Sequence, residues 1–282
     1  MQENKFKNAL YYTVLALILI IIIYFLSVFF ADFKAKKEAE EREQQLLIEE
    51  LERQEASERA KKILYLTGKF DPVQNDNFIL IPSDFALLSG SKMYLRKETY
   101  AAFRTMESAA RIDGISLVIA SATRNFDSQK DLWNKKWSGV TLVDGGNLAK
   151  QIPDGLTRFK KILEWSAAPA TSRHHWGTDI DINDADPEYF ETEKGKKEYE
   201  WLVANAPEYG FCQVYNTKGN GRTTGYNQEK WHWSYLPLAI SFTREYKELI
   251  KESDIFGFSG DTFVTKQDLI NEYVLSLNPE CL

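Results

Sequence analysis

Hydrophobic and polar residues separate sharply in the N-terminal part of the chain. Residues 9–31 form an almost entirely apolar run without a charged side chain. As an α-helix this run is about 34 Å long, which is enough to cross the hydrocarbon core of a bilayer. The apolar region of a cleaved signal peptide is normally about 7 to 15 residues long. The pattern therefore predicts an uncleaved transmembrane anchor at residues 9–31, preceded by a short tail at residues 1–8.

Residues 32–65 have the opposite character. Glu, Lys, Arg, Gln and Ala fill most of these positions, and neither Gly nor Pro interrupts them. These residue types are strong helix formers, but the apolar residues do not repeat in the sustained heptads of a stable coiled coil. We expect a solvated helical stalk, with a dimerisation element as the alternative. The oligomeric state stays open.

The remaining chain alternates between helical and extended patterns in an irregular order. Helical spacing or capping residues predict four helices, at 97–111, from 127 onward, at 154–166 and at 194–205. Extended patterns occupy 115–120, 178–182 and the stretch around His232. Because no regular β-α-β repeat appears, this order predicts an α+β fold with a small antiparallel sheet flanked by helices. We assign residues 66–253 to this domain and residues 254–282 to a C-terminal extension that packs on it.

Alternation within the predicted strands puts polar chemistry on one face. In the strand at 178–182, Ile180 and Ile182 point toward a core, and Asp179 and Asp181 lie on the opposite face of a half-buried strand. The stretch around His232 places its imidazole opposite the neighbouring tryptophans in the same way. Glu229 then falls in the turn before that strand.

All three histidines of the chain lie in two short stretches, at 172–181 and 229–233. His174, Asp181 and His232 are three nitrogen or oxygen ligands that leave one coordination position of a zinc ion open for water, and Glu229 is a base for the proton of that water. The alternative interpretation is a set of packed aromatic and imidazole groups in a satisfied polar core.

The two stretches also carry a family resemblance. The pattern Ser-x-His-x-x-Gly-x-x-x-Asp, followed at a distance by Glu-x-Trp-His, resembles the zinc D-alanyl-D-alanine carboxypeptidases and dipeptidases of the VanY and VanX type, which share a fold with the hedgehog signalling domain. A third element at 121–129 is similar to the Ser-x-x-Arg-Ser-x-x-x-Gln segment of that family. The family often has Ala where this chain has Asp179, so two carboxylates face one side. We follow the motif and choose Asp181 as the ligand.

The resemblance implies a role for each matching residue. Zinc is expected on His174, Asp181 and His232. Glu229 and Arg124 are expected to be catalytic, with Glu229 as the general base and Arg124 stabilising the oxyanion. Ser172 and Gln129 match residues that hold the substrate. His175, next to a ligand, is expected to pack rather than to bind metal.

The activity implied is that of a membrane-anchored carboxypeptidase that removes the terminal D-alanine from peptidoglycan stem peptides. An endopeptidase, a D-Ala-D-Ala dipeptidase and a non-catalytic, zinc-stabilised binding domain are the alternatives. Such a substrate requires a single-pass protein with its domain on the periplasmic or extracellular side. Two lysines precede the apolar run, whereas three lysines and one arginine follow it closely. By the positive-inside rule this count favours the cytoplasmic side instead.

Composition limits the partners further. The net charge of -6 argues against a nucleic-acid partner, because no basic surplus is available to neutralise phosphates. The chain has two cysteines, Cys212 and Cys281. They permit one disulfide in an oxidising compartment, while a buried thiol at Cys212 is equally compatible with its apolar surroundings.

Overall fold

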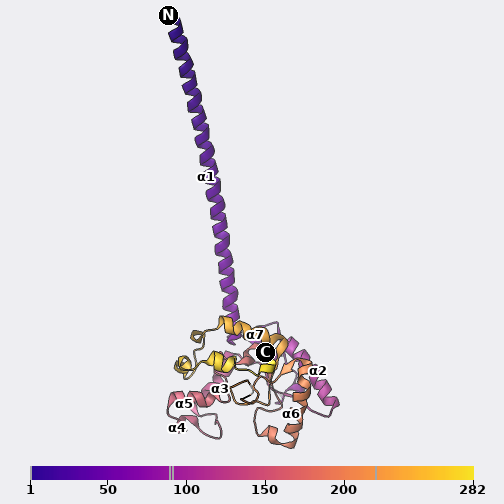
Figure 1. Cartoon of the computed structure of the whole chain (residues 1–282). Coiled ribbons are helices and arrows are strands. Elements are labelled where there is room, and N and C mark those ends of the chain that lie inside the picture. Colours follow the sequence, from indigo (N-terminus) through magenta and orange to yellow (C-terminus); the bar gives the residue numbers. More distant parts are fainter. Residues whose placement is uncertain (1, 89, 91, 220) are drawn as a thin grey trace. The chain divides into compact units, whose positions relative to one another are not determined.

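The computed structural model describes residues 2–88, 90, 92–219 and 221–282 (Figure 1). These divide into two compact units, of which one ends at Arg59 and the other comprises Ala60–Leu282. Helix α1 (Gln2–Leu66) runs without interruption through the predicted anchor and stalk. Among the described residues it is the one helix that is long and apolar enough to cross a membrane, a test that a signal sequence also passes.

A four-stranded antiparallel sheet forms the centre of the second unit. Its spatial order is β3 (Ile119–Ser121), β4 (Asp179–Ile182), β6 (His232–Tyr235) and β5 (Phe211–Cys212). A separate antiparallel pair consists of β1 (Phe78–Leu80) and β2 (Tyr94–Arg96). The predicted α+β class with a small antiparallel sheet is confirmed.

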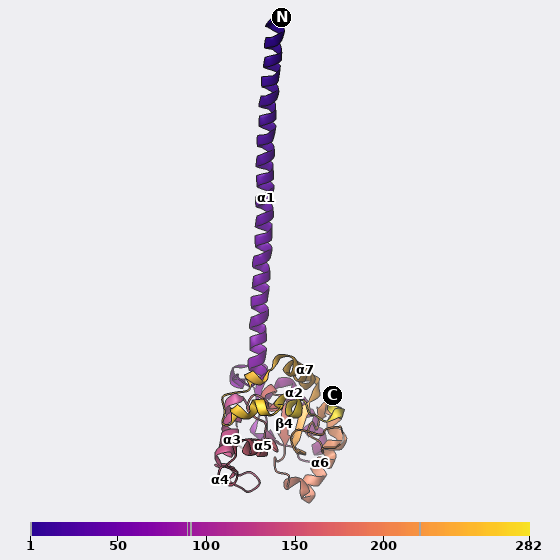
Figure 2. The same ribbon diagram turned by 60° about the vertical axis from the view of Figure 1, so that its left-hand side comes forward.

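Helices surround the central sheet, and Figure 2 shows β4 in their midst. The helices of this unit are α2 (Lys97–Ile112), α3 (Phe126–Ser138), α4 (Leu148–Gln151), α5 (Gly155–Leu163), α6 (Glu193–Asn205) and α7 (Leu236–Leu249). One core cluster joins the apolar face of the sheet to α2 and α6. A second contains residues of α3, α5, α7 and the C-terminal segment. The sheet therefore has one apolar face packed on helices, and its other face is free to carry polar groups.

Register fixes which residues share the polar face. On the apolar side, Ile180 of β4 lies opposite Trp233 of β6. The next pair in the ladder joins Asp181 to His232, so both lie on the other face. The prediction of a half-buried strand is wrong, because all four residues of β4 are buried. Residues of two further elements, η3 (Arg173–Trp176) and α7, contact the polar face and exclude solvent from it.

Two element boundaries differ from the sequence prediction. Strand β3 begins at Ile119 rather than at residue 115. Before Ile119, the Asn183 side chain forms the hydrogen bonds that a neighbouring strand would otherwise form. It accepts from the Val118 amide at 2.8 Å and donates to the Ser116 carbonyl at 3.0 Å. Helix α3 is capped by Asn125 rather than by Asp127, since the Asn125 side chain accepts from the amide of the third helical residue.

The C-terminal segment is tied to the sheet. Side chains from 255 to 281 contribute to the same core cluster as α3 and α5. The Asn278 amide donates to the Val214 carbonyl at 2.8 Å, just beyond β5. Cys212 and Cys281 form a disulfide with their Cα atoms 5.8 Å apart. This resolves the alternatives left open for the cysteines.

Candidate metal and catalytic site

The structure brings together the three residues predicted to bind metal. His174 lies in η3, Asp181 in β4 and His232 at the first position of β6. Between the first two, Gly177 ends η3 in the left-handed region at φ 74°. A Cβ atom there would also collide with the Phe78 ring. The glycine of the motif therefore permits the sharp turn that brings His174 back over the strand.

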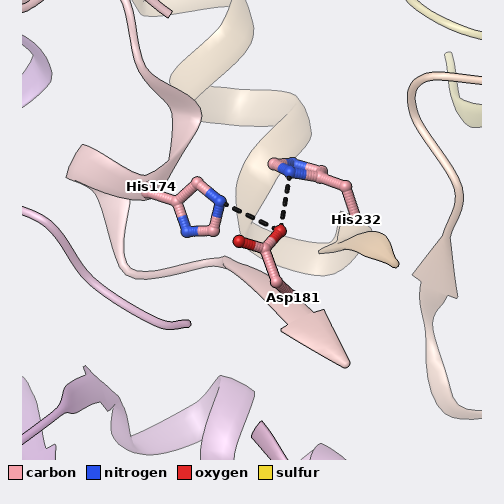
Figure 3. Close-up of side chains that lie close together, drawn as sticks. All are labelled: His174, Asp181 and His232. Carbon is pink, nitrogen blue, oxygen red and sulfur yellow. Dashed lines mark ion pairs between the residues drawn. The ribbon is translucent and has the colours of Figure 1, made fainter. Parts of the chain in front are cut away.

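The ligand atoms of these residues converge on one point (Figure 3). The Nε2 atom of His174 lies 3.3 Å from Oδ1 of Asp181, and the Nδ1 atom of His232 lies 3.2 Å from the same oxygen. One ligand atom from each of the three residues lies within 4.8 Å of the others, and all three side chains are buried.

Hydrogen bonds on the far side of each ring leave the inner nitrogen as a lone-pair donor. His174 donates through Nδ1 to the Ala122 carbonyl at 2.8 Å, and His232 donates through Nε2 to the Asp179 carboxylate at 3.0 Å. The Nε2 atom of His174 and Oδ1 of Asp181 are buried and form no hydrogen bond with any described residue. Buried polar atoms without partners are costly. A set of two imidazole nitrogens and one carboxylate oxygen fits a zinc ion.

Charge and burial act together on the protonation of these groups. Burial raises the pKa of Asp181, but the adjacent imidazoles of His174 and His232 hold it well below its usual range. Burial and the charge of Arg124 lower the pKa of His174. For His232, burial lowers the pKa, but the carboxylates of Asp179 and Asp181 raise it to about 9.

Asp179 belongs to a separate, buried network behind His232. Its Oδ1 accepts from Arg173 Nε and from His232 Nε2, each at 3.0 Å, and its Oδ2 accepts from the Thr178 hydroxyl at 2.6 Å. The Arg173 guanidinium also donates to the Ser234 hydroxyl at 2.8 Å. Of the two carboxylates on this face, only Asp181 keeps an oxygen for a metal ion.

Glu229 lies beside the cluster at the start of the turn before β6, as predicted. Its Oε2 is 3.4 Å from Nδ1 of His232. The backbone is held at both ends, because its amide donates to the Tyr215 carbonyl at 3.0 Å and its carbonyl accepts from Gln213 Nε2 at 2.9 Å. Burial raises the pKa of Glu229 to about 7. A carboxyl group with this pKa suits proton transfer near neutral pH.

The other three predicted residues line the same cavity, whose volume is about 680 Å³. Arg124 lies in the loop between β3 and α3, and its Nε is buried without a partner. Gln129 donates through Nε2 to the Ala167 carbonyl at 2.7 Å, which leaves its buried Oε1 without a described partner. Ser172 precedes η3 but its side chain makes no capping hydrogen bond. All seven predicted residues therefore border one cavity.

His175 lies outside the ligand cluster, as predicted. Its Nδ1 donates to the Arg124 carbonyl at 2.6 Å, and its Nε2 accepts from the Ala170 amide at 3.2 Å. Burial lowers the pKa of His175 to about 3, so the ring is neutral. The hydrogen bond from His175 therefore holds the backbone of Arg124 in place.

Comparison with known proteins finds a family whose model matches the segment that contains this site. The family model described as VanY, D-alanyl-D-alanine carboxypeptidase, matches residues 92–238, which is just over half of the chain. The chain belongs to the VanY family. All seven residues predicted for the site lie inside the segment that matches the VanY model.

Individual relatives of the VanY type show the extent of the likeness. A D-alanyl-D-alanine carboxypeptidase of Enterococcus faecalis is 28% identical over 155 residues, covering 54% of this chain and 51% of that protein. The putative carboxypeptidase YodJ of Bacillus subtilis is 30% identical over 151 residues, covering 51% and 47%. The chain thus spans about half of the length of these curated relatives. A crystal structure of a VanY mutant from a VanB-type resistance cassette, in complex with Zn(II), is 22% identical, with a TM-score of 0.42, and the match covers 63% of this chain and 94% of that one.

Three residues of this VanY-family site were missed from the sequence. Arg173 stands inside the motif, between Ser172 and His174, and holds Asp179. Tyr215 lies in a segment without a motif, and the centroid of its ring is 4.8 Å from the centroid of the His232 ring. Lys136 lines the cavity from α3. A spacing of seven residues from Gln129, two helical turns, was the available signal.

Proposed function

We propose that the chain is a zinc-dependent D-alanyl-D-alanine carboxypeptidase that releases the terminal D-alanine of peptidoglycan stem peptides. One observation carries the proposal: the free donor atoms of His174, Asp181 and His232 converge at a point that Glu229 borders. Membership of the VanY family supports the same chemistry. A purely structural metal site has no use for a buried glutamate beside an open coordination position, which argues against a non-catalytic binding domain.

Each residue of the site has a separate role in the proposed hydrolysis. Zinc, when bound, supplies a Lewis acid and lowers the pKa of a water molecule to about 7. Glu229 accepts a proton from the attacking water on its carboxylate and passes it to the nitrogen of the departing D-alanine. Arg124 places its positive charge near the substrate carbonyl, where it stabilises the oxyanion. Ser172 and Gln129 orient the peptide.

Metal analysis combined with a D-alanine release assay tests this proposal. We expect the full-length chain, purified in detergent, to contain one zinc ion and to release D-alanine from diacetyl-L-lysyl-D-alanyl-D-alanine. A chelator should stop the release, and added zinc should restore it. Absence of bound zinc, or of release in its presence, would contradict the proposal. Intact sacculi and free D-Ala-D-Ala, assayed in parallel, identify an endopeptidase or a dipeptidase.

Asp179 is expected to strengthen zinc binding through His232. Replacing it with Asn removes the negative charge that fixes the His232 ring, so we expect the affinity for zinc to fall about 10- to 100-fold. Competition with a chelating dye measures the change. Asp131→Asn is the matched control, because Asp131 is exposed on α3 and paired with Lys135. Equal zinc affinity in Asp179→Asn and wild type would show that the Asp179 contact has no influence on the metal.

We also propose that residues 9–31 anchor the protein with its domain on the periplasmic or extracellular side. The Cys212–Cys281 disulfide supports this orientation, since disulfides persist in oxidising compartments. The count of flanking basic residues favours the other orientation, but the substrate and the disulfide agree with each other.

A reporter fusion decides the orientation. Alkaline phosphatase joined after Lys62 is expected to be active, because this enzyme needs an oxidising compartment to fold. Green fluorescent protein joined at the same position is expected to remain dark. An inactive phosphatase together with a fluorescent partner fusion would put the domain in the cytoplasm.

A further inference from the structure

Besides Arg124, and Arg173 that is paired with Asp179, the catalytic cavity is lined by a third cationic side chain. Lys136 lies in the last turn of α3, two helical turns after Gln129 and on the same face of the helix. Lys136, Gln129, Arg124 and Glu229 all line the one cavity. The ammonium group of Lys136 therefore belongs to the space in which the proposed substrate binds.

This ammonium group forms no ion pair with any residue that the structure describes. Its Nζ donates to the Ser166 hydroxyl, a neutral group. The neighbouring Lys135 forms an ion pair with Asp131 on the outer face of α3 instead. Burial and the charge of Arg124 lower the pKa of Lys136, and the charges of Glu229 and Asp144 partly offset this. The ammonium group is half-buried and forms no ion pair with a described residue, so an anionic ligand in the cavity finds its positive charge available.

The charges around the cavity are unevenly distributed. The segment that follows β4 contributes Asp186 and Glu188 to the lining, and these repel a carboxylate. Asp144, another acidic residue of the lining, is already paired with Lys161 at 2.6 Å. The positive charge that is available to an anion therefore lies on the α3 side of the cavity.

We propose that Lys136 binds the free α-carboxylate at the C-terminus of the peptide substrate. In a carboxypeptidase reaction one carbon atom separates this carboxylate from the nitrogen of the bond that breaks, so the carboxylate must lie beside the groups that perform hydrolysis. Arg124 serves the carbonyl oxygen, Lys136 serves the carboxylate, and the Ser166 hydroxyl has its proton left to donate to the same group. The inference rests on the proposed peptidase function and narrows it to substrates that end in a free acid.

A pair of substrates tests the assignment. Diacetyl-L-lysyl-D-alanyl-D-alanine and its C-terminal amide differ only in the group that Lys136 is proposed to bind. We expect the full-length wild-type protein with zinc to prefer the acid. In Lys136→Met, kcat/KM for the acid should fall about 10- to 100-fold, mainly through KM, because a charge-assisted contact is lost. Hydrolysis of the amide and the zinc content should stay as in the wild type, and Lys136→Arg should restore part of the preference.

The readout is the ratio of acid to amide hydrolysis within each variant, which does not depend on how much of the protein is folded. Lys135→Met is the control and should keep the wild-type ratio. An unchanged ratio in Lys136→Met, or equal cleavage of acid and amide by the wild type, would overturn the assignment while leaving the peptidase function intact. Failure of the function itself looks different, because the zinc-loaded wild type would then cleave neither substrate.

Discussion

Replacing Glu229 with Gln is expected to lower the rate of D-alanine release by about 100- to 10,000-fold while zinc stays bound. Gln has the same shape but cannot accept the proton of water. The Glu229 side chain touches the cluster only through its 3.4 Å contact with His232, and its backbone is held by Tyr215 and Gln213. The substitution should therefore leave the cluster in position. Steady-state kinetics and metal analysis of the same preparation measure both effects.

Glu198→Gln is the matched control for this experiment. Glu198 is also buried, but it lies in α6, where its carboxylate accepts from the Tyr189 hydroxyl at 2.6 Å. This variant should retain both zinc and activity. Near-wild-type release of D-alanine by Glu229→Gln would show that another group serves as the base.

Replacing His232 with Ala is expected to remove zinc and activity together. One of the three donor atoms disappears, so the loss of zinc affinity should exceed the roughly 10- to 100-fold effect typical of groups that only orient a ligand. The change also leaves the Asp181 carboxylate buried with one fewer imidazole beside it. The zinc content after dialysis and the zinc affinity, determined by competition with a chelating dye, measure this loss.

The third histidine provides the control. His175 is as buried as His232, but it faces the Arg124 and Ala170 backbone and not the cluster. His175→Ala is therefore expected to keep its zinc. Zinc retention by His232→Ala, or zinc loss from His175→Ala with the fold intact, would contradict the assignment of the ligands.

The convergence of the candidate site could be predicted because its geometry is largely local. Alternation along β4 puts both aspartates on one face, and Gly177 fixes the turn that returns His174 to that face. Asp181 and His232 then meet because antiparallel neighbours pair directly. Spacing within the motifs contains most of this information, and the resemblance supplied the order of the segments.

Features that depend on distant segments could not be predicted in the same way. The choice between Asp179 and Asp181 is decided by Arg173, whose other partners lie in β6 and α7. The first residue of α3 is also tied to a distant segment, because the Phe126 amide donates to the Gly68 carbonyl at 2.7 Å, just beyond the end of another helix. Asn183 replaces a strand partner through its side chain. No local pattern distinguishes these outcomes from their alternatives.

The disulfide closes a loop that contains both Glu229 and His232. Its two cysteines are 69 positions apart, and in the chain-entropy description a cross-link of this span stabilises the folded state by about 4 kcal/mol. A newly synthesised chain with both thiols reduced lacks that contribution, so the protein is at its least stable before it is oxidised. Folding of this chain is thereby coupled to thiol oxidation.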